Sequence, residues 1–122
     1  MLKKIIFLAL ILAIVGGVFV FPGSVTAQDD ALSRIEEGKA ISFNRFKGNC
    51  LACHQVEGGE LMGNYGPPLI YMKARYPERD ALRAQIWDAA LKNPHTRMPP
   101  FGRNRILTEQ EIDLVTDYIH TL

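Results

Sequence analysis

The sequence predicts an all-α domain of short helices, and two observations support that fold class. Apolar residues recur near helical spacing in three stretches, residues 31–43, 77–92 and 108–122. The segment between the first two stretches shows no alternation of apolar and polar residues, the pattern that is typical of a β-strand. We therefore expect helices joined by loops.

The first helix is expected from about Ala31 to Phe43, because Asp29 or Asp30 can cap its start. Gly38 within it costs about 1 kcal/mol relative to alanine, but a glycine also allows another helix to approach closely. Residues 44–49 then form a short polar link in which Phe46 is expected to turn inward. The apolar stripe of this helix comprises Leu32, Ile35, Ala40, Ile41 and Phe43.

The second helix is expected to open at Pro77 and to run to about Leu91 or Lys92. Asn93-Pro94 ends it, since the residue before a proline disfavours helical geometry. Its inner side would carry Leu82, Ile86 and Leu91 together with Ala89 and Ala90.

The last helix begins with a capping box, because Thr108 is followed three residues later by Glu111. Its apolar face comprises Ile112, Val115, Ile119 and Leu122, with Tyr118 alongside. We expect this helix to cross the first one near Gly38 and to close the fold. His120, near its end, is expected at the surface.

A C-x-x-C-H run, Cys50-Leu51-Ala52-Cys53-His54, lies between the first two helices, and this run is typical of c-type haem attachment. Two thiols three residues apart share one face of a helical turn and can reach both vinyl groups of a porphyrin. His54 can then offer its imidazole to the iron as the proximal ligand. The helices would thus pack around one covalently attached haem c.

Two other interpretations of this run remain to be weighed. A thioredoxin-like dithiol requires a βαβ context, and no strand pattern flanks Cys50. A structural zinc site requires four nitrogen or sulfur ligands, whereas Cys50, Cys53 and His54 supply three. Both are weaker than haem attachment.

A ligating histidine usually has its second ring nitrogen held by a carbonyl or carboxylate. The Gly66-Pro67-Pro68-Leu69 segment follows His54 by about a dozen residues, and the carbonyl of Pro67 is our candidate acceptor. Leu69 would then press on the porphyrin. The alternative is a plain Pro-Pro turn without a ligand-binding role.

Met98 is the predicted sixth ligand, because a Met/His pair holds the iron of cytochromes c. It precedes Pro99-Pro100, which stiffens its loop and preorganises the thioether sulfur. The competing ligands are His95, which is the most serious, and His120, Met62, Met72 and Lys92.

The first 27 residues read as a secretory signal peptide, which leaves residues 28–122 as one monohaem domain. Lys3 and Lys4 precede an apolar run, and Val25-Thr26-Ala27 resembles a cleavage site of small residues. Haem c is attached outside the cytoplasm, so the expected location is the periplasm. Retention of the segment as a membrane anchor is the alternative.

The charge distribution argues against nucleic acid as a partner. The full chain carries 14 Lys+Arg and 13 Asp+Glu, and cleavage would remove two lysines. Basic residues gather in residues 73–105, whereas residues 106–122 hold four acids and no Lys or Arg. The basic stretch would steer an acidic protein or an anion, or it would simply form a solvated helix face.

The order C-x-x-C-H, G-P-x-L, Met-Pro loop and T-E-x-E helix resembles class I cytochromes c, whose fold is all-α. Within that class, residues 47–54, 63–69 and 97–102 resemble SoxX, the monohaem subunit of the SoxAX cytochrome complex of thiosulfate oxidation. The resemblance implies thioethers at Cys50 and Cys53 and ligation by His54 and Met98. It also implies a larger SoxA-type partner subunit in the periplasm.

The resemblance further implies electron transfer rather than catalysis by this chain. The SoxAX complex is an L-cysteine S-thiosulfotransferase that couples thiosulfate oxidatively to a carrier-protein cysteine, and its active site lies on the larger subunit. The small subunit would take up electrons by an outer-sphere mechanism and pass them to a downstream acceptor cytochrome. The alternatives are a free or membrane-anchored cytochrome c that serves a terminal oxidase or reductase, and a peroxidase-like haem with an open iron site.

Overall fold

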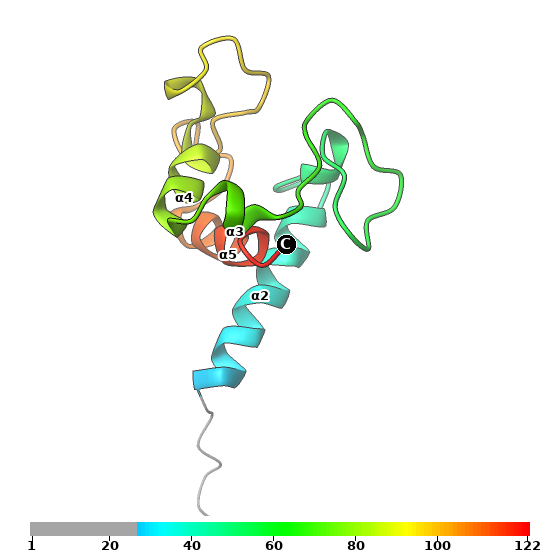
Figure 1. Ribbon diagram of the computed structural model, residues 1–122, viewed down its shortest axis with the longest axis vertical. Coiled ribbons are helices and arrows are strands. Elements are labelled where there is room, and N and C mark those ends of the chain that lie inside the picture. The colour runs from blue at the N-terminus through cyan, green and yellow to red at the C-terminus, as the bar shows by residue number, and fades with distance from the viewer. Residues whose placement is uncertain (1–26) are drawn as a thin grey trace, which may run out of the picture.

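The computed structural model describes residues 27–122, and within them it contains helices and loops but no strand (Figure 1). The predicted all-α fold class is confirmed. The predicted signal peptide, except Ala27, lies outside the described residues. None of the helices in residues 27–122 has the length and apolar character needed to span a membrane. In chain order the elements are α2 (Ala27–Phe43), the 3-10 helix η1 (Cys50–Ala52), α3 (Met72–Arg75), α4 (Arg79–Trp87), the 3-10 helix η2 (Ala89–Leu91) and α5 (Glu109–Ile119).

The first and last of these helices, α2 and α5, cross at Gly38 as predicted (Figure 1). A Cβ atom on Gly38 would lie 2.0 Å from the carbonyl oxygen of Leu114, so only glycine permits this approach. Next to the crossing, the rings of Phe43 and Tyr118 pack edge to face with centroids 6.2 Å apart. The predicted capping box of Thr108 and Glu111 is present and starts α5.

The second predicted helix is shorter than expected, because it breaks at Asp88 instead of continuing to residue 91 or 92. Asp88 adopts a non-helical conformation (φ −156°), and its buried side chain accepts a hydrogen bond from the backbone N–H of Ala90. Its other carboxylate oxygen pairs with Arg103 at 2.9 Å. A buried carboxylate needs such partners, so the chain turns into η2 to supply them.

The hydrophobic core lies where α4, α5 and the loop after η1 meet. Ile112, Val115 and Ile119 supply the α5 face and Leu82 and Ile86 the α4 face, as predicted. The remaining members of the core are Val56, Leu69, Met72, Phe101, Leu107 and Tyr118.

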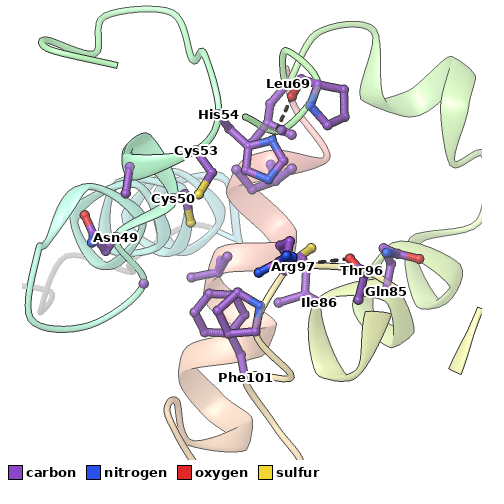
Figure 2. Close-up of a pocket in the computed structure, with 18 of the residues that line it drawn as sticks. Asn49, Cys50, Cys53, His54, Leu69, Gln85, Ile86, Thr96, Arg97 and Phe101 are labelled. Carbon is purple, nitrogen blue, oxygen red and sulfur yellow. Dashed lines mark hydrogen bonds between the residues drawn. The ribbon is translucent and has the colours of Figure 1, made fainter. Parts of the chain in front are cut away.

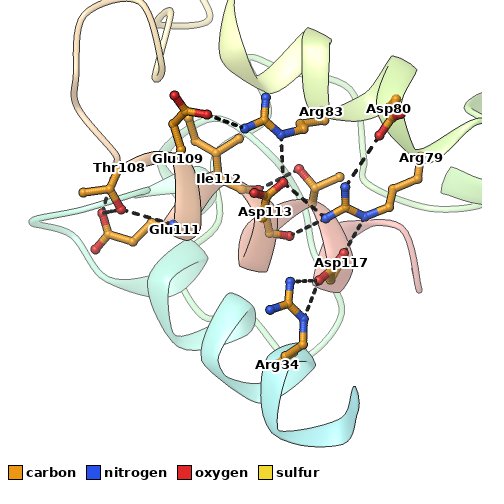
Figure 3. Close-up of polar contacts among 11 residues, drawn as sticks. Arg34, Arg79, Asp80, Arg83, Thr108, Glu109, Glu111, Ile112, Asp113 and Asp117 are labelled. Atoms are coloured by element: carbon orange, nitrogen blue, oxygen red, sulfur yellow. Dashed lines mark hydrogen bonds and ion pairs between the residues drawn. The ribbon is translucent and has the colours of Figure 1, made fainter. Parts of the chain in front are cut away.

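A network of ion pairs joins α2, α4 and α5 on their solvent side (Figure 3). Asp117 accepts from both Arg34 and Arg79, while Asp113 accepts from Arg79 and from the Nε atom of Arg83 at 2.7 Å. The guanidinium groups of Arg83 and Arg79 hold the pKa of Asp113 below its usual value, with the hydrogen bond from Arg83 as the largest cause. Part of the predicted basic stretch is thus neutralised by the acidic last helix.

Several sequence predictions about single side chains are wrong. Leu32 is 54% exposed, because the first turns of α2 extend beyond its crossing with α5 (Figure 1). Phe46 is 99% exposed, since its backbone N–H bonds to the side chain of Asn44 and the resulting turn projects outward. Leu91 is 78% exposed after the break at Asp88. His120 is half-buried instead of superficial, because its ring bonds to the carbonyl of Tyr76.

The start of α2 also differs from the prediction. The helix begins at Ala27 rather than near Ala31, which places Asp29 and Asp30 in its first turn instead of at its cap. Acidic side chains in a first turn interact favourably with the helix dipole, so they are compatible with the longer helix.

Candidate functional site

A cavity of about 710 Å³ lies between the C-x-x-C-H turn and the loop after η2. Figure 2 shows Cys50, Cys53 and His54 on one side of it, with Thr96, Arg97 and Phe101 across from them. Core side chains form much of its wall, among them Leu69, Met72, Leu82, Ile86, Phe101, Leu107, Val115 and Ile119. The cavity therefore opens directly onto the hydrophobic core.

The C-x-x-C-H turn is folded so that both thiols and the imidazole line this cavity. The backbone N–H groups of Cys53 and His54 both donate to the carbonyl of Cys50, at 3.2 and 2.9 Å, which closes one helical turn. Asn49, with φ of 47°, starts the turn in the left-handed region. Cys50 is half-buried, and its burial raises the pKa of its thiol to about 11.

The loop at residues 57–69 is held against this turn by backbone hydrogen bonds. Gly63 donates to the carbonyl of Leu51 at 2.7 Å, and Gly66 donates to that of Cys53 at 2.8 Å. Leu69 donates to Gln55 at 2.9 Å, and its buried side chain lines the cavity, where it was predicted to meet a porphyrin. The loop thus forms a rigid floor beneath the attachment turn.

His54 is oriented from two sides. Its Nδ1 atom lies 2.7 Å from the carbonyl oxygen of Pro67, so the predicted hydrogen bond is present (Figure 2). A Cβ atom on Gly66 would lie 2.5 Å from Cε1 of the ring, which means that Gly66 packs directly against the imidazole. A carbonyl acceptor at Nδ1 fixes the tautomer and leaves Nε2 as the nitrogen for a metal.

Met98 also lines the cavity, on the loop of residues 93–101 and next to Arg97, which Figure 2 shows across from the attachment turn. Its side chain is partly buried against the core. Its backbone N–H donates to the hydroxyl of Thr96 at 3.1 Å, and a similar turn joins the N–H of His95 to the side chain of Asn93. The loop ends where Gly102 donates to the carbonyl of Trp87 at 3.1 Å. Local turns and two prolines therefore determine where the thioether lies.

Of the rival sixth ligands, three have other contacts and do not line the cavity. The Met62 sulfur accepts from the N–H of Val56 at 3.0 Å, His120 bonds to Tyr76, and Lys92 lies over the Tyr76 ring. Met72 lines the cavity as part of the core, with its sulfur 3.3 Å from Arg75. His95 lines it as an exposed residue. The geometry thus narrows the candidates chiefly to Met98 and His95.

The zinc and dithiol interpretations do not fit this site. Within residues 27–122, no three Cys, His, Asp or Glu side chains cluster as metal ligands. That same range contains helices and loops only, so the βαβ context of a redox dithiol is missing.

The residues do fit a covalently attached tetrapyrrole. The cavity volume lies in the range of roughly 300–1,000 Å³ that is usual for small-molecule sites. Its wall is apolar, the two thiols lie on one turn, and an oriented imidazole stands beside them. Two supporting residues were not predicted from the sequence: Gly66, which packs against the imidazole, and Thr96, whose hydroxyl accepts the N–H of Met98. The glycine before Pro67-Pro68 could have indicated such a close approach.

Comparison with known proteins agrees with this geometry. The family model described as cytochrome c matches residues 35–122, which is most of the chain and includes the whole cavity. A search of curated proteins finds no match. The chain therefore belongs to the cytochrome c family, and it is an electron-transfer protein with a covalently attached haem c.

Proposed function

We propose that this cytochrome works in the periplasm as the small, SoxX-like subunit of a SoxAX-type complex. Electron transfer follows from the family, whereas the subunit assignment rests on the motifs in residues 47–54, 63–69 and 97–102. In this role the chain takes up single electrons released when the larger subunit couples thiosulfate to a carrier-protein cysteine, and passes them to an acceptor cytochrome. It performs no acid–base or nucleophilic step itself.

The ligand set is part of the proposal. Haem c, when bound, supplies a one-electron Fe(III)/Fe(II) couple. Cys50 and Cys53 would form the thioethers, and His54, through Nε2, and Met98 would ligate the iron. The hydrogen bond from His54 to Pro67 is the observation that carries this assignment, because ligating histidines usually have such a partner.

The charges around the cavity support an acidic protein as the partner. Arg45, Arg75 and Arg97 line the cavity, and its lining within residues 27–122 includes no Asp or Glu. Lys47 also lines it but pairs with Glu111. Arg79 and Arg83, in contrast, pair with the acids of α5 and contribute little to a long-range field. A one-sided positive surface raises the rate of encounter with a negative partner.

A free or membrane-anchored cytochrome c that serves a terminal oxidase or reductase is the second candidate. The uncharged stretch at residues 5–21 favours it if that segment is retained, because about 17 residues are the least that can span a membrane. The two candidates differ in their partners rather than in their haem ligands.

Purification of the native holoprotein at low ionic strength distinguishes the two candidates. A SoxX-like subunit should elute with a larger haem-containing polypeptide in a 1:1 ratio and dissociate from it as salt is raised. Elution as a lone cytochrome, with reduction by a membrane quinol-oxidising fraction, would support the second candidate instead.

Replacement of Met98 tests the ligand set. Met98→Ala should keep the haem attached but lower the reduction potential on the order of 0.1 V or more, since axial ligands spread haem potentials over about 0.8 V. The ferric spectrum should lose its Fe–S charge-transfer band, and the ferrous protein should bind CO. His95→Ala is the matched control and should change none of these. If His95→Ala shows these changes and Met98→Ala does not, His95 is the ligand instead.

A further inference from the structure

The Pro67–Pro68 turn beneath His54 depends on donors from elsewhere in the chain. Neither proline has a backbone N–H, so the turn has few hydrogen bonds of its own. Its two carbonyls face different donors: that of Pro67 meets His54 Nδ1 at 2.7 Å, and that of Pro68 accepts from the guanidinium of Arg75 at 2.8 Å. The position of the Pro67 carbonyl is therefore coupled to the hydrogen bond between Arg75 and the adjacent Pro68 carbonyl.

Arg75 is itself firmly placed at the end of α3. The backbone N–H of Arg75 donates to Tyr71 at 3.1 Å, and the same guanidinium nitrogen that reaches Pro68 lies 3.3 Å from the buried sulfur of Met72. Met72 is 2% exposed, and its N–H donates to the carbonyl of Leu122 at 2.7 Å. The donor to Pro68 thus stands on an element that is tied to the core.

We propose that Arg75 is a positioning residue for the proximal ligand. By holding the Pro68 carbonyl, it fixes the turn that keeps the Pro67 carbonyl on the Nδ1–H of His54. The inference rests on the proposed role of His54 as an iron ligand. A planar guanidinium can hold the carbonyl and the sulfur together, whereas an ammonium group can replace it only in part.

Exchange of the His54 Nδ1 proton with solvent tests this role in the holoprotein. Arg75→Met and Arg75→Lys are compared with Lys73→Met, which removes one positive charge from the same helix. We expect the proton to exchange about tenfold faster in Arg75→Met, because the loss of one hydrogen bond permits local opening of the turn. Arg75→Lys should lie between this variant and the wild type, and Lys73→Met should match the wild type.

Two further measurements separate positioning from general stability. The amide protons of α5 should exchange at wild-type rates in all variants, and the reduction potential should move more in Arg75→Met than in Lys73→Met. An unchanged His54 proton in Arg75→Met, equal effects of the two methionine variants, or uniformly faster exchange in α5 would each overturn the inference. The spectrum of the wild-type holoprotein is recorded before any variant is made. A spectrum without the features of histidine and methionine ligation would overturn the proposed ligand set itself, independently of Arg75.

Discussion

The two sides of the haem cavity are built by different means. The proximal side, residues 47–69, is held together by long-range backbone hydrogen bonds, such as those of Gly63 and Gly66 to the attachment turn. The distal side, residues 93–101, relies on local turns, in which Thr96 and Asn93 bond to residues two positions along the chain. The imidazole of His54 is therefore positioned by hydrogen bonds between distant segments, whereas the thioether of Met98 is positioned only by the stiffness of its own loop.

This difference suggests a division of labour. Substitutions on the proximal side should disturb the attachment turn and the hydrogen bonds that orient His54, so they should reduce haem retention and the stability of the fold. Substitutions on the distal side should leave the attachment turn unchanged and alter only the proposed bond from Met98 to the iron. The reduction potential can thus vary through the distal loop without loss of the cofactor.

The largest expected effect comes from adding a side chain at Gly66, which packs directly against the imidazole of His54. Gly66→Ala places a Cβ atom 2.5 Å from the His54 ring, so the ring or the loop must move. We expect roughly 3 kcal/mol of lost stability, the upper part of the range for overpacking, together with a lower yield of haem-loaded protein. Guanidinium unfolding of the holoprotein and the haem-to-protein ratio measure the two effects.

Gly58→Ala is the control for that variant, because nothing lies within 4 Å of its Cβ position. Gly58 has a φ of 75°, so alanine there should cost about 1–2 kcal/mol from backbone strain alone. Comparable losses of haem in both variants would show that crowding of the His54 ring by residue 66 has no specific effect. The proposed difference between the two sides of the cavity would then be wrong.

A smaller effect is expected on the distal side from Thr96→Val. Valine preserves the shape but loses the hydroxyl that accepts the N–H of Met98 at 3.1 Å. Global stability should fall by only about 1 kcal/mol, the usual net worth of one hydrogen bond, while haem attachment stays complete. Exchange of Met98 for added imidazole should become faster, as followed by stopped-flow absorbance. Reduced haem content in this variant would contradict the division between the two sides.

The smallest effect concerns the ion pair of Lys47 with Glu111, which fastens the proximal segment to α5. The hydrogen bond from Lys47 lowers the pKa of Glu111, and the N–H of Thr108 adds to that effect. A lowered pKa adds stability that is present above the unfolded value of about 4.3 and is lost as the pH falls through the folded value. Lys47→Met should therefore cost up to about 1 kcal/mol at pH 7, and this cost should shrink as the pH falls toward 3.

Unfolding titrations between pH 7 and pH 3 measure that difference. Lys73→Met serves as the charge-matched control, and its effect should stay nearly constant across the same range. A Lys47→Met cost that grows toward low pH would have the wrong sign for a lowered pKa and would refute the ion pair as its source.

The sequence predicted what short-range patterns determine. The attachment turn, the capping box of Thr108 and Glu111, and the Pro67 acceptor all follow from residues close together in the chain or from one chemical requirement. The crossing at Gly38 was also predictable, because a glycine within an amphipathic helix indicates close packing.

What the sequence could not predict depends on partners distant along the chain. The break at Asp88 depends on Arg103, fifteen positions later, and without that partner a continuous helix was the simpler expectation. The exposure of Leu91 follows from the same break. Arg75 reads as an ordinary basic residue until the fold brings it to the Pro68 carbonyl.

The crossing of α2 and α5 has a consequence for the order of assembly. Val115 and Ile119, which line the cavity together with Cys50 and Cys53, belong to α5, and α5 packs on α2. The wall of the cavity is therefore incomplete until α5 docks on α2. A porphyrin enters most easily before that docking step, so haem attachment and closure of the core are coupled events.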